Sequence, residues 1–113
     1  MFSKEFSVAV MVKDARKSVQ WYKEKLHMES SVAEHWVTVW NNGSNWKIHL
    51  CEGNPEPGNT GIALYTDDLT RLAGQLKKEN VMFVKDVTKE SWGTYAQISD
   101  LDGNIIWLIE GSP

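Results

Sequence analysis

The stretch Val8-Ala9-Val10-Met11-Val12-Lys13-Asp14 places five apolar residues before a lysine and an aspartate. The apolar run predicts a β-strand, and the aspartate is a preferred N-cap for a helix that follows it. A shift of 54 positions along the chain places Ile62-Ala63-Leu64-Tyr65 over Val8–Met11, and Asp68 over Asp14. The pattern therefore indicates two copies of one unit, each beginning with a strand, an aspartate and a helix.

The first copy continues from its helix into a hairpin. We expect a strand at Phe6–Val12 and a helix at Ala15–Leu26, where apolar residues recur at helical spacing. Two further strands, Val37–Trp40 and Trp46–Cys51, flank a loop in which Asn42-Gly43 suits a tight turn.

The second copy has the same order of elements. We expect a strand at Gly61–Thr66, a helix capped by Asp67 or Asp68 with Leu69, Leu72, Ala73 and Leu76 inward, a strand at Val81–Val84, and a hairpin of Thr94–Ser99 and Asn104–Glu110 across the turn Asp100–Gly103. Each copy thus reads βαβββ. The sequence predicts an α+β fold in which two such modules form a curved, mostly antiparallel sheet, a cup with the helices on its convex side.

The length of the chain suits one domain. At 113 residues we expect a single domain, 1–113, made of two modules at about 1–53 and 60–113. Residues 54–59 are rich in proline and glycine for their length and are predicted to be the linker.

Composition excludes several classes of partner. The net charge of −3 argues against nucleic-acid binding, which needs a basic patch. The longest apolar run, Ile105–Ile109, is far shorter than the roughly 20 residues of a membrane span. The first residues lack an apolar signal core, and the single cysteine, Cys51, cannot form an internal disulfide. We therefore expect a cytoplasmic protein without nucleic-acid or membrane partners.

The register of the first hairpin decides which side chains face the cup. With a four-residue loop, Asn42–Asn45, Thr38 pairs with His49. Val37 and Val39 then face the helix. A five-residue loop turns both valines into the cup instead. We favour the shorter loop because it gathers the aliphatic residues on one face.

The six tryptophans of the chain exceed what a small core normally uses. Alternation along the strands predicts a small-molecule site on the concave face, with aromatic walls and a few polar groups. Its predicted ligand-binding residues are Trp36, Thr38, Trp40, Lys47, His49, Tyr65, Trp92, Gln97 and Trp107, with Tyr95 on the same face. The alternative is that the tryptophans fill the cup and leave no pocket.

Four stretches of the sequence closely resemble the vicinal oxygen chelate superfamily, which includes glyoxalase I, extradiol dioxygenases and bleomycin-resistance proteins. They are Val8–Asp14 running into Ser18–Tyr22, then Trp46–Leu50, Gly61–Tyr65, and Trp92-Gly93 followed by Asp100–Asn104. The last resembles the family's Asp-Pro-Asp-Gly-Asn turn, with Leu101 in place of the proline. The resemblance covers nearly the whole chain and implies the same two-module fold.

The resemblance also implies four positions for the ligands of a divalent cation. In this chain they are occupied by Ser7, His49, Gly61 and Trp107. Only the imidazole of His49 is a competent ligand, and a catalytic metal normally has three or more protein ligands. We therefore expect no metal and no other cofactor.

The leading functional hypothesis is a metal-free protein similar to the bleomycin-resistance branch. Such a protein would sequester an aromatic or cationic small molecule, as in antibiotic resistance, without changing it chemically. The resemblance further implies a homodimer. One alternative is an enzyme, a lyase, isomerase or dioxygenase, either metal-dependent or using His49 as a general acid–base. Another is an accessory module that binds no ligand.

Overall fold

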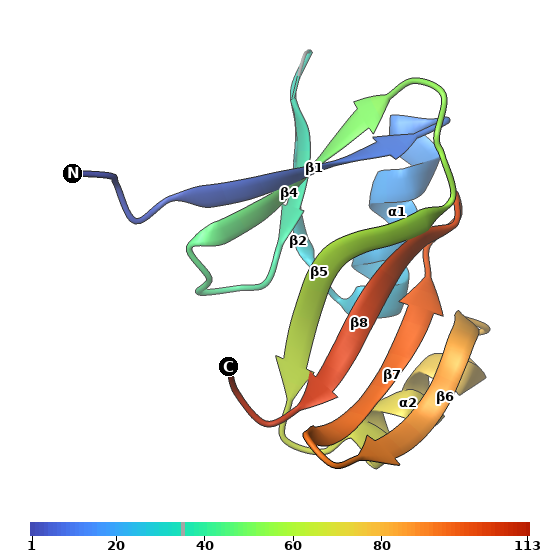
Figure 1. Ribbon diagram of the computed structural model, residues 1–113. Coiled ribbons are helices and arrows are strands. Elements are labelled where there is room, and N and C mark those ends of the chain that lie inside the picture. The colour runs from blue at the N-terminus through green and yellow to red at the C-terminus, as the bar shows by residue number, and fades with distance from the viewer. Residues whose placement is uncertain (35) are drawn as a thin grey trace. The chain divides into compact units, whose positions relative to one another are not determined.

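The computed structural model describes residues 1–34 and 36–113. These residues form two helices and eight strands (Figure 1). In chain order the elements are β1 Phe6–Val12, α1 Ala15–Leu26, β2 Glu29–Val32, β3 Val37–Trp40, β4 Trp46–Glu52, β5 Gly58–Thr66, α2 Leu69–Lys78, β6 Met82–Glu90, β7 Gly93–Ser99 and β8 Asn104–Glu110. The predicted α+β fold with two βαβββ modules is confirmed.

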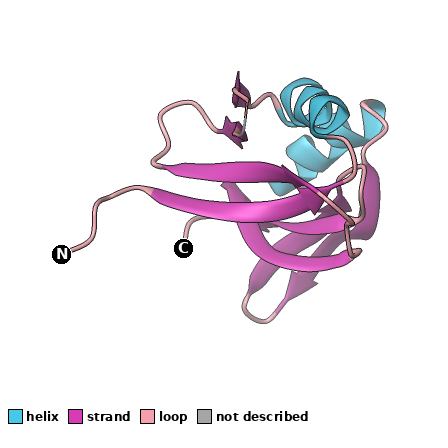
Figure 2. Cartoon of the chain, turned by 90° about the horizontal axis from the view of Figure 1, so that it is seen from above, coloured by secondary structure: helices cyan, strands magenta, loops and turns pink. Residues whose placement is uncertain are grey.

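The chain divides into two compact units, Met1–Glu56 and Pro57–Pro113, here called the N-terminal and the C-terminal unit. Each unit has its own four-stranded sheet, in the order β1-β4-β3-β2 and β5-β8-β7-β6. In both sheets the first pair is parallel and the other two pairs are antiparallel. Figure 2 distinguishes the helices from the strands, and both figures show the residues before β1 extending beyond the strand.

Helix α1 begins and ends where the sequence predicts. The Asp14 carboxylate accepts hydrogen bonds from the backbone N–H groups of Arg16 and Lys17, at 3.0 and 3.1 Å. At the other end His27 adopts a left-handed conformation with φ of 54°, which stops the helix. The buried face of α1 contains Ala15, Ser18, Val19, Trp21 and Tyr22.

The hairpin between β3 and β4 has the predicted register. Thr38 pairs with His49, and Val39 pairs with Ile48. Val39, Ile48 and Leu50 are buried, as expected for the aliphatic side of this hairpin.

Strand β2 has no counterpart among the predicted ranges. It reads Glu29-Ser30-Ser31-Val32 and is largely exposed, so that it lacks the apolar alternation by which a strand is recognised. Backbone pairing with β3 holds it at the edge of the sheet, Ser30 lying opposite Val39. An edge strand needs no apolar face, and hydrophobic patterning therefore does not reveal it.

Helix α2 is capped by Asp68, whose carboxylate accepts the N–H of Arg71 at 3.1 Å. Leu69, Ala73 and Leu76 are buried as predicted, whereas Leu72 is half-buried.

A feature that the sequence did not suggest recurs at the start of both helices. The Glu52 carboxylate, at the end of β4, accepts the N–H of Ala15 at 2.9 Å. The Glu110 carboxylate, at the end of β8, accepts the N–H of Leu69 at 3.0 Å. In each unit the strand parallel to the first strand therefore also satisfies the first free N–H group of the helix.

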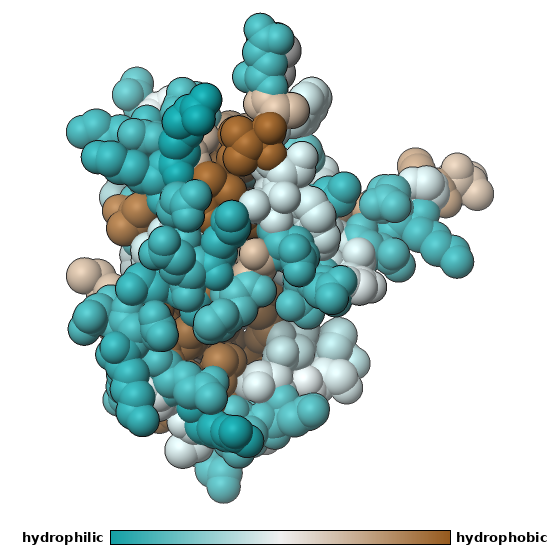
Figure 3. All heavy atoms as spheres, turned by 180° about the vertical axis from the view of Figure 1, so that it is seen from behind, coloured by the Kyte–Doolittle hydropathy of each residue, from teal (hydrophilic) through white to brown (hydrophobic). Residues whose placement is uncertain are grey.

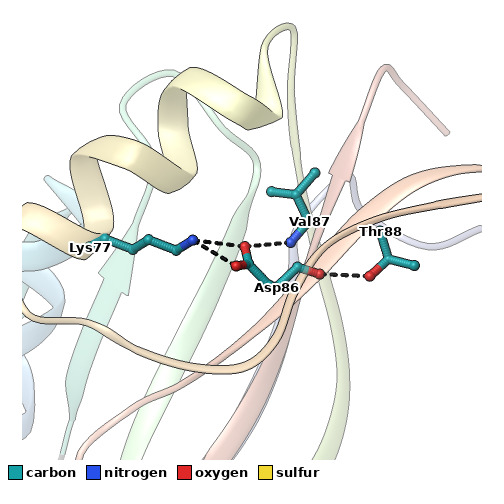
Figure 4. A network of polar contacts seen from close by, with 4 residues as sticks. All are labelled: Lys77, Asp86, Val87 and Thr88. Carbon is teal, nitrogen blue, oxygen red and sulfur yellow. Dashed lines mark hydrogen bonds and ion pairs between the residues drawn. The ribbon is translucent and has the colours of Figure 1, made fainter.

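Strand β6 extends to Glu90, well beyond the predicted end at Val84. The added residues are mainly polar, and the pairing with β7 contains two register shifts. Asp86 on this segment accepts two hydrogen bonds from the Lys77 ammonium of α2, at 2.9 and 2.8 Å (Figure 4). The hydrogen bond with Lys77, together with one from the Val87 N–H, lowers the pKa of Asp86 below its usual value of 3.8.

The turn before β8 is held by its first aspartate. The Asp100 carboxylate accepts the N–H groups of Asp102 and Asn104 and the side-chain amide of Asn104, at 2.9, 3.0 and 2.9 Å. The face of the molecule seen in Figure 3 is mainly hydrophilic, with apolar side chains visible between polar ones.

Candidate functional site

The predicted ligand-binding residues divide between the two units. Trp36, Thr38, Trp40, Lys47 and His49 belong to the N-terminal unit, and Tyr65, Trp92, Gln97 and Trp107 belong to the C-terminal unit. Each group has its own arrangement.

In the N-terminal unit, Trp36 lies against His49. The two rings meet edge to face with centroids 4.9 Å apart, and 62% of the Trp36 surface is exposed. The Nδ1 atom of His49 is buried, and it has no hydrogen-bond partner among the described residues. A catalytic histidine is normally oriented by a carboxylate or carbonyl at this nitrogen, and the described residues supply none.

Trp40 and Lys47 form a second contact in this unit. The Lys47 ammonium lies 4.8 Å from the centroid of the Trp40 ring, within the range of a cation–π interaction. One face of this tryptophan is thus already covered by a cation of the protein itself. Thr38, opposite His49, is buried.

A hollow of about 600 Å³ opens beside Trp36 and His49. The described residues that line it come from the start of α1, the end of β2 and the segment after it, the start of β3 and the end of β4: Ala15, Arg16, Val32, Ala33, Glu34, Trp36, Val37, His49, Leu50, Cys51 and Glu52. The side chain of Cys51 is half-buried and lines the hollow. In the segment after β2 the sequence predicted Trp36 as a site residue, but not Ala33 and Glu34, which belong to no periodic pattern.

In the C-terminal unit, three aromatic rings follow one another in a ladder made of Trp92, Tyr95 and Trp107. The centroids of Trp92 and Tyr95 lie 5.1 Å apart with the planes tilted by 30°. Those of Tyr95 and Trp107 lie 5.0 Å apart with the planes at 22°. Trp92 is 57% exposed, whereas Tyr95 is only 9% exposed. The ladder therefore ends in an open aromatic face.

The pairing of β7 with β8 explains why these rings meet. Tyr95 lies opposite Ile109, and Gln97 lies opposite Trp107, as the alternation of the sequence predicted. Tyr95 is therefore the diagonal neighbour of Trp107 on one face of the sheet, which is within reach of aromatic rings. Tyr65 on β5 is paired with Ile109 and is 42% exposed.

Asn59 is a further residue of this group that sequence reasoning missed. Its side-chain oxygen accepts the indole N–H of Trp107 at 3.1 Å and the backbone N–H of Gly61 at 3.0 Å. The sequence places Asn59 in the linker, where no strand alternation assigns its side chain to a face. Its position follows from β5, which begins at Gly58 rather than at Gly61.

The side chains at the family's four metal positions do not fit a metal centre. Gly61 has no side chain, and the indole N–H of Trp107 is a hydrogen-bond donor already used by Asn59. Ser7 is an exposed hydroxyl on β1, which leaves His49 as the one strong ligand of the four. Among the described residues, no three His, Cys, Asp or Glu side chains gather as metal ligands would.

Comparison with known proteins finds relatives that match nearly the whole chain. The uncharacterized protein YetH of Bacillus subtilis (strain 168) is 27% identical over 116 residues, which covers 92% of this chain and 95% of that protein. A superfamily member from Sphaerobacter thermophilus DSM 20745 has a structure that matches with a TM-score of 0.89 at 27% identity, over 98% of this chain and 99% of that chain.

A second solved structure is that of TnmS3, described as an antibiotic binding protein, from Streptomyces sp. CB03234. It matches with a TM-score of 0.84 at 27% identity, over 98% of both chains.

Among the described residues, neither helix has the length and apolar character needed to cross a membrane.

The sequence profile of the Glyoxalase/Bleomycin resistance protein/Dioxygenase superfamily matches residues 6–108, nearly the whole of both βαβββ modules. The resemblance seen in the sequence is thereby confirmed. The chain belongs to the Glyoxalase/Bleomycin resistance protein/Dioxygenase superfamily.

Proposed function

We propose that this protein binds a planar aromatic small molecule and sequesters it without changing it chemically. The observation that carries the proposal is the ladder of Trp92, Tyr95 and Trp107, which ends in an exposed indole face. Aromatic rings stack favourably in offset arrangements with centroids 4.5–7 Å apart. A flat ligand would add one more ring to this series.

The family position of the ladder supports the same reading. Trp107 occupies a position that holds a metal ligand in the metalloenzymes of the superfamily. In this chain the position offers an indole face and no electron pair for a metal. The superfamily relative TnmS3 is described as an antibiotic binding protein, which makes binding without conversion a function available to this fold.

Sequestration is favoured over catalysis because the candidate acid–base group is not oriented. The buried Nδ1 of His49 has no described partner, and the donor set does not fit a metal. We therefore propose a metal-free binding protein with no cofactor.

An aromatic ligand is favoured over a purely cationic one. Lys47 already lies over Trp40, and a ligand cation approaching that ring would meet the like charge of the ammonium. Within the C-terminal unit the proposed ligand contacts are Tyr65, Trp92, Gln97 and Trp107, together with Tyr95. The five residues predicted in the N-terminal unit, Trp36, Thr38, Trp40, Lys47 and His49, are proposed as contacts of that unit by itself.

Binding can be tested with two tricyclic probes of one shape, proflavine, which is a cation, and acridone, which is neutral. We expect both to quench tryptophan fluorescence saturably and to be recovered with unchanged mass. Spermidine, a cation without a ring, should not bind. Trp92→Ala should weaken binding, whereas Trp46→Phe, outside the proposed contacts, is the matched control. Absence of binding by both tricyclic probes, or recovery of a converted product, would contradict the proposal.

The family also supports proposals about assembly and location. We propose a homodimer in the cytoplasm, formed by chains that each fold as one domain over residues 1–113. Light scattering after size-exclusion chromatography should give twice the chain mass of 12.9 kDa. A mass of one chain at micromolar concentration would contradict the dimer.

A further inference from the structure

We propose that Asn59 is a positioning residue that fixes the indole of Trp107 and thereby holds the aromatic ladder ready for a ligand. This inference rests on the proposed function, since it concerns how the same site is preorganised. Asn59 lies 48 positions before Trp107 in the sequence and on another strand.

One side-chain oxygen of Asn59 serves two donors. It accepts the indole N–H of Trp107 at 3.1 Å and the backbone N–H of Gly61 at 3.0 Å. The bond to Gly61 ties the carboxamide to its own strand, and the bond to Trp107 ties the indole to the carboxamide. The indole N–H is the only polar group of the Trp107 side chain, so this bond selects one orientation of the ring.

The pairing of β5 with β8 places the carboxamide where it can reach the ring. Asn59 lies opposite Ile105, and the next described pair is Ala63 opposite Trp107, with a register shift between them. Ile105 and Trp107 are two residues apart on β8 and point to the same face, so Asn59 stands beside Trp107 on that face. Gly61, inside the shift, has a φ of +78°, a conformation that other residues rarely adopt.

The irregular segment of β5 has a second and separate support. The Thr60 hydroxyl donates to the Ile105 carbonyl oxygen at 2.7 Å and accepts the N–H of Ile62 at 3.0 Å. These bonds hold the backbone without touching Trp107. Removal of the Asn59 carboxamide should therefore free the ring while the strand stays in place.

A held ring matters for binding because ordering a side chain costs free energy at the moment of association. Trp107 stacks on Tyr95 at 5.0 Å, and Tyr95 stacks on Trp92 at 5.1 Å. An indole that rotated freely at this end of the ladder would leave Tyr95 without a fixed neighbour on one side. The bond to Asn59 thus removes part of the ordering cost that a stacked ligand would otherwise carry.

The test compares Asn59→Ala, Asn59→Asp and Thr60→Val in the full chain. Without ligand, the indole N–H of Trp107 is followed by ¹⁵N NMR and hydrogen exchange, and the ladder by near-UV circular dichroism. Asn59→Ala should speed exchange of this N–H and weaken the dichroism of the stacked rings. Asn59→Asp keeps an accepting oxygen and should restore both signals. Thr60→Val removes the backbone support but keeps the Asn59 carboxamide, so it should change both signals less than Asn59→Ala does.

Affinity for proflavine is measured on the same variants. Asn59→Ala removes the bonds to Trp107 and to Gly61. Loss of the Trp107 bond, at ordinary strength, predicts affinity about three- to tenfold lower for Asn59→Ala, with Asn59→Asp close to wild type. An unchanged indole N–H in Asn59→Ala overturns the positioning role. A change in the Trp107 N–H that is as large in Thr60→Val as in Asn59→Ala also overturns this role, because the effect then comes from the strand. Undiminished affinity in a variant whose ring has been freed overturns the link to binding.

Failure of the proposed function gives a different result. In that case wild-type protein does not bind proflavine or acridone, while the indole N–H of Trp107 still responds to Asn59→Ala and is restored by Asn59→Asp. This result would support the role of Asn59 in positioning the Trp107 ring and would contradict a role of that ring in binding the ligand.

Discussion

The side chain at position 107 shows how the type of one residue changes what a site can bind. The resemblance to the metalloenzymes of the superfamily implies a metal ligand at the position of Trp107, whereas here an indole stacks on Tyr95 and donates its N–H to Asn59. The exchange removes a donor of electrons to a metal and provides a flat apolar face. Together with Ser7 and Gly61 at two other implied metal positions, this exchange favours binding of a flat ligand over coordination of a metal on the same fold.

The residue types that form the aromatic ladder could be predicted from the sequence, but its support could not. Alternation along β7 and β8 placed Tyr95, Gln97 and Trp107 on one face, and the pairing confirms it. Asn59 was not predicted because its side chain acts within an irregular part of β5, where the period of two is interrupted.

Gly103 provides a test of local backbone strain. Its φ is +82°, and a Cβ built there would lie 2.8 Å from the Cβ of Pro57. Gly103→Ala should lower the free energy of unfolding by about 1–3 kcal/mol, because a left-handed conformation and a close approach are both penalised. Chemical denaturation measures the change.

The control for this prediction is Gly74→Ala in helix α2, where nothing lies within 4 Å of the added Cβ. Alanine has the higher helix propensity, so this variant should be more stable by up to about 1 kcal/mol. Equal effects of the two substitutions would show that backbone conformation does not determine the result.

Whole elements were predicted where their residues bury an apolar face. β1, α1, β3 and β8 have the predicted bounds, and each alternates or repeats with a clear period. β2 was missed and β6 was predicted too short, because both are edge strands with polar residues. Backbone pairing rather than side-chain burial forms these segments, and side-chain patterns carry little information about it.

The two glutamates that accept the first N–H group of each helix give a prediction for each unit. Glu52→Ala removes the acceptor of the Ala15 N–H, and Glu110→Ala removes that of Leu69. Each should cost about 0.5–2 kcal/mol of stability, as for the loss of a helix cap. Glu52→Gln and Glu110→Gln keep an accepting oxygen and should cost less. Thermal unfolding tests the order, and equal losses for Ala and Gln would exclude this hydrogen bond as the cause.

The contact between α2 and β6 predicts a dependence of stability on pH. The hydrogen bond with Lys77 lowers the pKa of Asp86 in the folded protein below its usual value of 3.8. The stabilising contribution is therefore present above the pKa of the unfolded chain and is lost as the pH falls through the lowered pKa. Asp86→Asn should lower stability slightly at neutral pH, and the difference from wild type should vanish in strong acid.

Salt provides the control for this contact, because both side chains are largely exposed. The difference between Asp86→Asn and wild type should shrink at high ionic strength, where charges at the surface are screened. A difference that persists in acid and in high salt would contradict an electrostatic origin.

At the scale of the whole molecule, ligand binding should raise the free energy of unfolding. A ligand that binds only the folded chain raises the free energy of unfolding by about 2.7 kcal/mol at 100 times its dissociation constant. Proflavine at that excess should therefore raise the unfolding midpoint of wild-type protein. Spermidine at the same concentration is the control. An unchanged midpoint despite fluorescence quenching would indicate that the dye binds the unfolded chain equally well.

The two glutamates also bear on how the chain is completed during synthesis. The first N–H of α1 is satisfied by a residue 37 positions later, and that of α2 by one 41 positions later. A growing chain that has released α1 but not β4 thus carries a helix whose first turn is still open to water. Each of these N–H groups is satisfied by the last strand of its own unit, so this hydrogen bond of α1 can form once the N-terminal unit has left the ribosome, before the C-terminal unit is made.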